Sequence, residues 1–418
     1  MRPDGPLEPT LTAARARIAA VRPEAYARSR NALDGAVSGL SPYLTHGLVT
    51  LPQVLAGVLA GVAPAQDLPV SHRFVFELGW RAYFRHVWAQ RGDGILQSLH
   101  AGPLPDDAYR RELPAEVRAG RSGLPVLDRA VQTLYACGHL HNHARLWLAS
   151  ALVHLYRVHW RVGADWLYGH LLDGDLASNH LSWQWVAGTG SAKPYLFNAE
   201  NVARYAPPDW HSPGSVIDCG YDALDRRARD AACPVIPAQA GIQVGSGGHL
   251  FDPLPEPPLL TAPPADLGLT APDPAAVAGR EVWLVHPWSL GERPADLPAD
   301  AVVLGVFVAD FHRAWPWAER RWRFVDRRMA ELTPLRWWGR AADLAQALAG
   351  ARRVQALDDP HLAPWLSRHA RLRPAPALFP PVARRCDSFS QWWTRATQGL
   401  TGSAELLTQG GGEPPVRP

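Results

Sequence analysis

The sequence predicts a mostly α-helical region followed by a small α/β domain. Three observations support this fold class. From residue 10 to about residue 206, apolar residues recur with helical spacing between short turns. Residues 207–279 are rich in proline, glycine and alanine and show little periodicity. From residue 280 onward, short apolar runs alternate with amphipathic stretches, as in a layered α/β domain.

The composition is that of a globular protein that can build large cores. Of the 418 residues, 47% are hydrophobic and 19% are charged, and this length predicts two domains. The formal net charge of +3 is compatible with an anionic partner but does not by itself indicate one. Lys193 is the only lysine among the 42 basic residues, so nearly all of them are arginines, which suit bidentate phosphate contacts.

Nothing in the sequence predicts a metal centre or a membrane segment. The four cysteines form no CxxC pair, so we expect free thiols in a reducing compartment. Arg15 and Arg17 interrupt residues 13–21, which therefore lack the apolar core of a secretion signal. The most apolar run, residues 147–156, is too short to span a bilayer. We expect a cytoplasmic, monomeric protein without membrane contact.

Near the N-terminus, helices are predicted for residues 10–29 and 51–62, on either side of a serine-rich loop. The loop, residues 38–44, reads Ser-Gly-Leu-Ser-Pro-Tyr-Leu, and its hydroxyl and backbone N–H groups suit phosphate oxygens. Serine-rich turns are common, and a helix N-cap is the simpler interpretation of this one. The loop alone does not establish a phosphate site.

A long helix is predicted for residues 74–91. Glu77, Trp80, Arg81 and Phe84 are spaced i, i+3, i+4 and i+7, so an acid, an indole and a guanidinium share one face. An internal Glu–Arg pair on a half-buried helix is the simplest interpretation of this segment by itself.

A histidine-rich turn precedes the next apolar helix, which runs to Trp160. Arg145 lies on the apolar stripe of that helix, so we expect it to be buried and to need an acidic partner. His139 and His143, at i and i+4, have the spacing of metal ligands. No motif supplies a third ligand, so no metal site is predicted.

Residues 173–190 contain a capped turn and a tryptophan-rich helix. Asp173 and Asp175 flank a glycine, and Asp175 is a good N-cap for the helix that follows. Asn179 and Trp183 fall on one face of this helix, whereas Trp185 points elsewhere. By itself, the segment is most simply a core helix filled with tryptophan.

The C-terminal region reads as alternating strands and helices. Strands are predicted at residues 282–285, 302–308 and 353–357, and no glycine-rich nucleotide fingerprint follows the first of them. Helices are predicted at residues 318–332 and 341–348. The predicted organisation is a helical domain (1–206), a linker or insertion (207–279), an α/β domain (280–380) and a tail (381–418).

Several motifs between residues 26 and 205 together resemble the helical FAD-binding domain of the DNA photolyase/cryptochrome family. The motifs are Tyr26, residues 38–44, Glu77-Leu-Gly-Trp-Arg81, residues 123–128 with Asp128, His141-Asn142 with Arg145, residues 173–179, and Trp183-Gln-Trp185. Each motif alone is only weak evidence for the family. Their shared order and spacing make the resemblance specific.

The resemblance implies FAD as the cofactor. The positions that match the cofactor site are Tyr26, Ser38, Leu40, Ser41, Phe74, Arg81, Asn142, Arg145, Asp173, Asp175 and Asn179. Asp173 is then the acid that Arg145 requires. Asn179 is expected to face the flavin N5, where an amide biases which reduced state persists.

The resemblance also implies damaged DNA as the partner, with a flipped pyrimidine dimer held beside the flavin. Glu77, Trp80, Asn142 and Trp185 match the residues that hold the dimer in the family. All four are retained, which favours a repair enzyme.

The catalytic positions implied by the resemblance are Asn179 and two members of a tryptophan electron relay, Trp183 and Trp160. The family's usual outer tryptophan is absent. The relay therefore ends on another aromatic residue, such as Tyr156 or Trp166, or is shorter.

The chain departs from the family pattern in the order of its parts. Residues 280–378 resemble a reduced form of the family's antenna-chromophore domain, which in the family precedes the FAD domain. This partial match does not support an antenna pigment. Val37, Phe74 and His143 replace residues common in the family, and the histidine is expected to weaken DNA contact because an arginine is usual there.

The function expected from this resemblance is light-driven repair of cyclobutane pyrimidine dimers. The alternative is a cryptochrome-like photoreceptor that binds FAD and signals without repair. A flavin-binding scaffold without photochemistry is disfavoured by Asn179 and by the Trp183–Trp160 pair.

Overall fold

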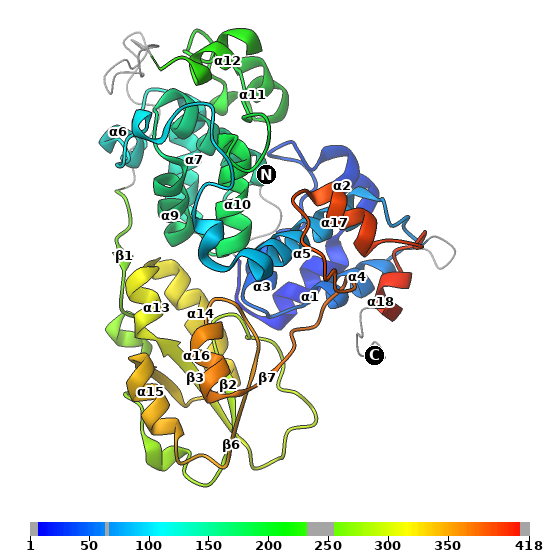
Figure 1. Ribbon diagram of the computed structural model, residues 1–418, viewed down its shortest axis with the longest axis vertical. Coiled ribbons are helices and arrows are strands. Elements are labelled where there is room, and N and C mark those ends of the chain that lie inside the picture. Colours follow the sequence, from blue (N-terminus) through cyan, green and yellow to red (C-terminus); the bar gives the residue numbers. More distant parts are fainter. Residues whose placement is uncertain (1–6, 63–66, 232–254, 410–418) are drawn as a thin grey trace. The chain divides into compact units, whose positions relative to one another are not determined.

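The computed structural model describes residues 7–62, 67–231 and 255–409 (Figure 1). The chain divides into two compact units. We call residues 28–37, 90–231 and 255–258 the helical unit, and residues 7–27, 38–62, 67–89 and 259–409 the mixed unit. The part of the chain that the structure describes is a mixed α and α/β structure with 49% helix and a parallel five-stranded sheet.

The helical unit is built from short helices around one apolar core. Its elements are η1 (Gly92–Leu96), η2 (Asp106–Ala108), α6 (Ala115–Arg118), α7 (Pro125–Cys137), α8 (Asn142–Ser150), the π-helical turn η3 (Ala151–Leu155), α9 (Trp160–His170), α10 (Leu176–Ala187), α11 (Ala199–Tyr205), η4 (Pro208–Trp210) and α12 (Tyr221–Arg229). Local sequence explains their ends: α7 begins at Pro125 and stops at Gly138, whose φ is +66°.

Helices α9 and α10 pack closely because a glycine lies between them. A Cβ atom at Gly163 of α9 would come within 2.4 Å of the Trp183 ring on α10. Trp183 therefore lies directly against the backbone of α9 and is only 3% exposed. This close packing places the tryptophan-rich helix in the core of the unit, as predicted.

Residues beyond 207, predicted to be a linker, contribute to the core of the helical unit. Ile217 and Leu224 are buried in it. The buried Arg157, whose φ of 55° is unusual for a residue with a side chain, donates hydrogen bonds to the carbonyls of Arg227, Ala228 and Asp230. The first two of these carbonyls lie in the last turn of α12, so Arg157 caps that helix.

The mixed unit opens with helices. These are α1 (Leu11–Ala20), α2 (Pro23–Ser29), α3 (Ser41–Thr45), α4 (Leu51–Ala60) and α5 (Arg73–Arg91). The single helix predicted for residues 10–29 is broken into α1 and α2, because a residue before proline disfavours the helical conformation and Pro23 starts a new helix. The predicted helices at 51–62 and 74–91 are present as α4 and α5.

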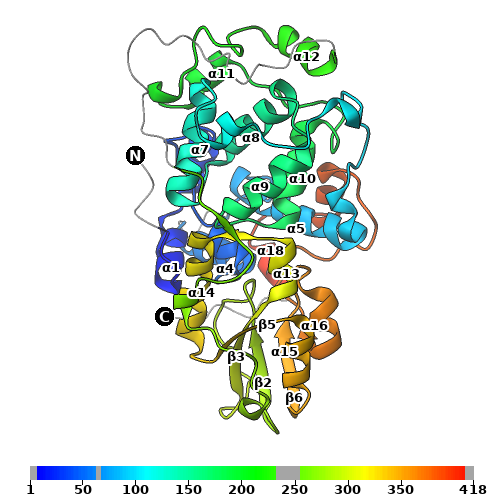
Figure 2. The ribbon, with the colours of Figure 1, turned by 90° about the vertical axis from the view of Figure 1, so that its left-hand side faces the viewer.

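The five-stranded sheet is entirely parallel, in the order β5-β3-β2-β6-β7. Figure 2 shows β2 beside β3 in this sheet. Its strands are β2 (Glu281–Val285), β3 (Val302–Val308), β5 (Arg336–Gly339), β6 (Arg353–Leu357) and β7 (Arg371–Arg373), and β1 (Leu259–Leu260) pairs separately with β4 (Trp317–Ala318). The sheet changes winding direction between β2 and β6, which is where open α/β sheets usually form a crevice.

The rest of the mixed unit is helical. Helices α13 (Ala309–Ala314), α14 (Glu319–Leu332), α15 (Ala341–Leu348) and α16 (Ala363–His369) alternate with the strands, and α17 (Phe389–Ala396) and α18 (Glu405–Gln409) follow. Residues 381–409, predicted to be a tail, are thus folded. Asp67 holds α18, because its carboxylate accepts hydrogen bonds from the Ser403 hydroxyl at 3.0 Å and from the Ala404 N–H at 3.1 Å.

The predicted domain boundaries at 206, 279 and 380 do not coincide with the limits of the compact units, since α1, α4 and most of α5 group with the sheet. Among the described residues, no helix is both long and apolar enough to cross a membrane.

Candidate functional site

The predicted pair of Arg145 and Asp173 is present in the helical unit. One guanidinium nitrogen of Arg145 contacts both carboxylate oxygens of Asp173, at 2.9 and 2.8 Å, and its Nε donates to the Leu140 carbonyl at 2.7 Å. The Asp173 side chain is only 3% exposed. A carboxylate this deeply buried needs its cationic partner, so the pair fixes α8 against the turn before α10.

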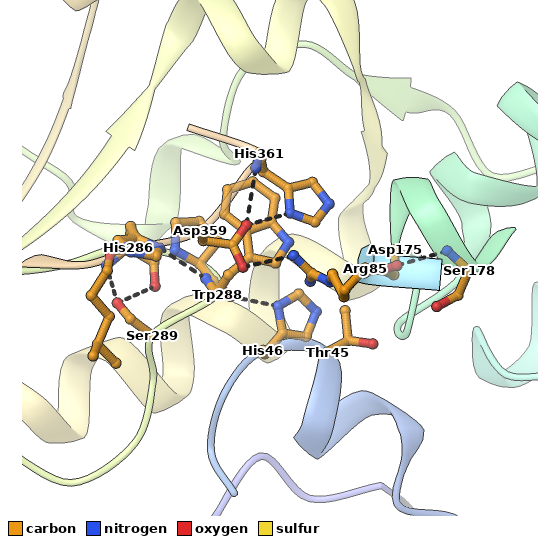
Figure 3. Close-up of polar contacts among 12 residues, drawn as sticks. Thr45, His46, Arg85, Asp175, Ser178, His286, Trp288, Ser289, Asp359 and His361 are labelled. Atoms are coloured by element: carbon orange, nitrogen blue, oxygen red, sulfur yellow. Dashed lines mark hydrogen bonds and ion pairs between the residues drawn. The ribbon is translucent and has the colours of Figure 1, made fainter. Parts of the chain in front are cut away.

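Asp175 caps α10 as predicted. Its Oδ1 accepts the backbone N–H of Ser178 at 2.8 Å, and the residue is almost fully buried (Figure 3). A carboxylate at this position also interacts favourably with the positive end of the helix dipole. The start of α10, and with it Asn179 one turn later, is therefore held in a fixed position.

The amide nitrogen of the Asn179 side chain is hydrogen-bonded within the protein, whereas its amide oxygen is available to a ligand. Its Nδ2 donates to the Ala164 carbonyl of α9 at 2.8 Å. No hydrogen bond within the described part of the chain uses its Oδ1. The side chain can therefore accept a hydrogen bond from a ligand without giving up its contact with α9.

His180, which sequence reasoning missed, lies next to Asn179 and is completely buried. Its Nε2 lies 2.8 Å from an Asp165 oxygen that also accepts Arg161 Nε at 2.6 Å, and its Nδ1 lies 3.0 Å from the Leu176 carbonyl. Burial lowers the pKa of His180, and Asp165 opposes that shift. The Arg161–Asp165 spacing of i, i+4 was the only signal in the sequence for this network.

The two tryptophans of the Trp-Gln-Trp motif have opposite environments. Trp183 is buried against α9, whereas Trp185 is 40% exposed and its ring lies 5.4 Å from that of Tyr195. Between them, Gln184 is fixed by the Ile95 carbonyl and the Leu99 N–H. The prediction that Trp185 points away from Trp183 is confirmed.

Tyr195 extends the exposed aromatic surface. It lines an open groove with Leu196, Tyr221 and Arg226. Tyr195 and Tyr221 gave no recognisable sequence motif, because they become neighbours only when α12 folds onto the core. Asn142, another predicted contact residue, is exposed at the first position of α8.

His143 is engaged inside the helical unit. Its Nδ1 lies 2.7 Å from the Asn31 carbonyl and its ring stacks on Trp147 at 4.7 Å. Burial, with His143 and His139 close by, lowers the pKa of the adjacent His141 to about 4. This turn is therefore neutral at positions 141 and 143 near pH 7, and His143 is occupied by structural contacts.

Trp160 and Trp183, the two residues predicted to form an electron relay, lie on the packed helices α9 and α10. Trp160 Nε1 donates to the Ser98 hydroxyl at 2.9 Å. Its ring neighbours are His180, at 6.4 Å, and His159, at 5.7 Å, and His159 in turn lies 6.2 Å from Tyr109. Neither Tyr156 nor Trp166, the two outer members suggested by the sequence, makes a ring contact with Trp160.

In the mixed unit, the serine-rich loop lies against a buried arginine that sequence reasoning missed. A Cβ atom at Gly39, whose φ is +60°, would come within 2.6 Å of Arg17 Nη1. Burial raises the pKa of the nearby Tyr43, and Arg17 opposes that shift. A guanidinium beside a loop that contains Ser38, Leu40 and Ser41 gives the loop the charge that an anionic phosphate requires.

Three other predicted cofactor residues, Tyr26, Phe74 and Arg81, belong to the same compact unit. Tyr26 and Phe74 pack edge to face with ring centroids 5.4 Å apart, and Phe74 is buried. Arg81 donates to the hydroxyl of the buried Thr45 at 3.0 Å, which ties α5 to the end of α3. Glu77, on the same helix, is half-buried.

Trp80, predicted to contact DNA, is covered by the C-terminal part of the chain. Its ring is stacked on Phe389 of α17, with centroids 4.0 Å apart and planes only 14° from parallel. Nothing in the sequence pattern of α5 indicates this cover.

A buried polar cluster, also missed in the sequence, follows the C-terminal ends of β2 and β6, the two strands between which the sheet changes direction (Figure 3). Asp359, after β6, accepts hydrogen bonds from Arg85 of α5 at 3.1 Å and from His361 Nδ1 at 2.6 Å. The His361 ring stacks on Trp288, which follows β2, at 4.1 Å. Burial opposes ionisation of Asp359, but Arg85 and His361 outweigh it and hold its pKa well below the usual range.

Residues 74–209 match the model of the FAD binding domain of DNA photolyase. Among similar proteins are cryptochrome DASH of Gloeobacter violaceus, 32% identical over 44% of this chain and 38% of its own length, and the deoxyribodipyrimidine photo-lyase of Streptomyces griseus, 37% identical over 48% and 46%. The Escherichia coli deoxyribodipyrimidine photo-lyase is 34% identical over 44% of this chain and 43% of its own length.

The matches thus span less than half the length of these relatives, which include both photo-lyases and a cryptochrome. The matched region contains α10, with Asn179, Trp183 and Trp185, and most of α5. The open Oδ1 of Asn179 and the Arg145–Asp173 pair are compatible with a bound flavin. The chain therefore carries the FAD-binding domain of the DNA photolyase/cryptochrome family, and its cofactor is FAD.

Proposed function

We propose that this protein repairs pyrimidine dimers in damaged DNA by light-driven electron transfer. The observation that carries the proposal is the arrangement of α10. One face of this helix carries the buried Trp183 and Asn179, whose Oδ1 is available to a ligand. The exposed Trp185 projects from another face. A single rigid element thus combines a group that tunes a flavin with an aromatic ring that can stack on a base.

Residues of this chain would hold the FAD, and the FAD would supply the electron for repair. Arg145, Asp173 and Asp175 fix α10, and Asn179 Oδ1 would accept a hydrogen bond from a protonated flavin N5. When bound, reduced FAD would supply the light-driven one-electron chemistry that cleaves the two inter-ring C–C bonds of the dimer. No net oxidation or reduction of substrate results.

On the DNA side, Trp185 and Asn142 are the contact residues that the structure leaves exposed. Trp185 would stack on the flipped dimer, and Asn142 would hydrogen-bond a pyrimidine edge. His143 is held by Asn31 and Trp147, so it adds no phosphate contact. Affinity for undamaged DNA would therefore be low and dependent on salt.

Ring contacts favour Tyr109 as the outer end of the electron relay. The sequence of contacts Trp160, His159 and Tyr109 leads from the buried α9 to a partly exposed residue. An external reductant would then restore Tyr109 after it has given an electron toward Trp160. This replaces the earlier candidates Tyr156 and Trp166.

The second candidate is a photoreceptor that binds FAD without repairing DNA. It is favoured by one observation, the coverage of Trp80 by Phe389. A repair enzyme needs its dimer-binding rings accessible, whereas a photoreceptor does not.

The test is a repair assay with purified protein. We expect a flavin absorption spectrum, preferential binding to a single strand that contains a thymine dimer, and recovery of thymines under blue light but not in darkness. Protein that binds FAD, shows no preference for the lesion and restores no thymines would instead support the photoreceptor.

A further inference from the structure

One face of α5 is aromatic and is covered by a helix that lies about three hundred residues later in the chain. Phe76, Gly79, Trp80 and Tyr83 are spaced i, i+3, i+4 and i+7 and therefore share this face. Helix α17 packs on it within the mixed unit (Figure 1). We call this contact the α5–α17 cover.

The cover is close and mostly aromatic. Phe389 lies 4.0 Å from Trp80 and 4.6 Å from Phe76, measured between ring centroids. Trp393 lies over Gly79, where a Cβ atom would come within 2.3 Å of its ring. The absence of a side chain at position 79 is therefore what allows α17 to reach the backbone of α5.

The contact with Trp80 differs from the other contacts of Phe389 with α5. Phe389 meets Phe76 and Tyr83 at 67° and 89°, which are ordinary edge-to-face packings. It meets Trp80 nearly face to face, at 14°. This is the geometry in which a nucleobase stacks on an indole, so Phe389 occupies the space that a base on this face of Trp80 would need.

Helix α17 is a small element that depends on docking. It has only eight residues, begins at the N-cap Ser388 and buries Phe389, Trp392 and Ala396 along one face. Its other face is polar and exposed at Gln391, Thr394 and Arg395. Isolated helices of this length are not stable in water, so α17 keeps its form through the aromatic contact.

We propose that α17 is a built-in competitor of the nucleic acid, which must leave the α5 face before a base can stack on Trp80. The proposal rests on the repair function proposed above. Docked α17 sets a low affinity for bases at Trp80, and displacement of α17 makes the stacking face of Trp80 available. The partner that displaces it is single-stranded or flipped-out DNA, whose bases offer the same flat aromatic faces as Phe389.

The test compares full-length variants in darkness, using a fluorescein-labelled oligonucleotide that contains one thymine dimer. Phe389→Ala should bind about tenfold more tightly than wild type, because the stacking face of Trp80 is released. Phe389→Tyr, which keeps a ring in place, should bind like wild type. Adding Trp80→Ala to Phe389→Ala should abolish the gain.

Equal affinity of wild type and Phe389→Ala would overturn the proposal, and so would a gain that persists without Trp80. A second measurement needs no variant. Hydrogen exchange of residues 389–396 in wild type should accelerate when saturating dimer oligonucleotide is added, and unchanged exchange would also overturn the proposal.

Illumination separates this proposal from the repair function. If Phe389→Ala binds more tightly but no thymines are restored, the proposal that α17 competes with DNA is supported and the repair function is refuted. If wild type repairs the dimer but Phe389→Ala binds with unchanged affinity, the proposal that α17 competes with DNA is refuted and the repair function is supported. Failure of every variant to bind the oligonucleotide refutes both.

Discussion

Helices α10 and α5 each carry a tryptophan that matches a dimer-binding residue, yet the two side chains are in different states. Trp185 of α10 is 40% exposed and has Tyr195 beside it. The ring of Trp80 on α5 is stacked on Phe389 of α17. A motif thus identifies the type of residue and its helix face, whereas access to that face is decided by whatever distant segment packs on it.

The two helices are also anchored differently. Helix α10 is held by local contacts, the Asp175 cap and the nearby Ala164 carbonyl. Helix α5 is held by residues far away in sequence, since Arg85 pairs with Asp359 and Gly79 accommodates Trp393. We therefore expect substitutions near α10 to act on the flavin and substitutions near α5 to act on accessibility.

The largest effect is expected from Arg145→Ala. It removes the cationic partner of the buried Asp173 carboxylate, a change that costs about 3–5 kcal/mol, and it should empty the FAD site. Chemical denaturation and the flavin absorbance of the purified protein measure the two consequences. Arg229→Ala, which breaks the exposed pair with Asp225, is the matched control and should change neither. Recovery of Arg145→Ala with a full complement of FAD would contradict this assignment.

A second prediction concerns Glu256, which fastens residues 255–258 to the helical unit. Its carboxylate accepts hydrogen bonds from Trp166 Nε1 at 2.9 Å and Arg118 Nε at 2.6 Å, and lies 3.3 Å from His170 Nε2. Burial opposes ionisation, but these three neighbours outweigh it and lower the pKa of Glu256 to about 2.

Because the folded-state pKa of Glu256 is depressed, its contribution is complete above the unfolded value of about 4.3 and is lost as the pH falls toward 2. Glu256→Gln should therefore cost about 1–3 kcal/mol at pH 7 and much less near pH 2. Urea titrations of both proteins at pH 7 and at low pH test this. An equal difference at both pH values would show that the carboxylate charge is not involved.

Elements fixed by local interactions could be predicted from the sequence, whereas elements that depend on distant residues were missed. Local signals located α4 and α5 and placed Asp175 as the cap of α10. Strands β5 and β7 were missed because they are short and begin with arginine, without an apolar run. Helices α17 and α18 were missed because their stability comes from α5 and Asp67, not from their own sequence.

The candidate site shows the same division. Arg145 and Asp173 could be paired from sequence because a buried arginine requires an acid and a matching motif supplied one. The roles of Arg17 and of the Asp359–His361 cluster could not be predicted, because these residues contact Gly39 and Arg85, which are distant from them in the sequence. Charge and size alone do not show which distant residue will meet which.

The smallest effect is expected from Tyr109→Phe. The ring and its contact with His159 remain, but the phenolic proton that a tyrosine can release on oxidation is lost. Light-driven recovery of reduced flavin with an external reductant should slow, while dimer affinity and FAD content stay unchanged. Tyr156→Phe is the control, because Tyr156 has no ring contact with Trp160. An equal slowing in both variants would remove Tyr109 from the relay.

The central claim is that Trp185 on α10 receives the dimer, whereas Trp80 on α5 is covered in the free protein. It is tested most directly by the dark affinity of wild type, Trp185→Ala and Trp80→Ala for the dimer oligonucleotide, followed by illumination. Trp185→Ala should retain FAD, bind roughly ten- to a hundredfold more weakly and lose repair at limiting DNA. Trp80→Ala should weaken binding much less, because wild type must first displace Phe389 to use that ring. Unchanged affinity and repair in Trp185→Ala, with FAD still bound, would contradict the account.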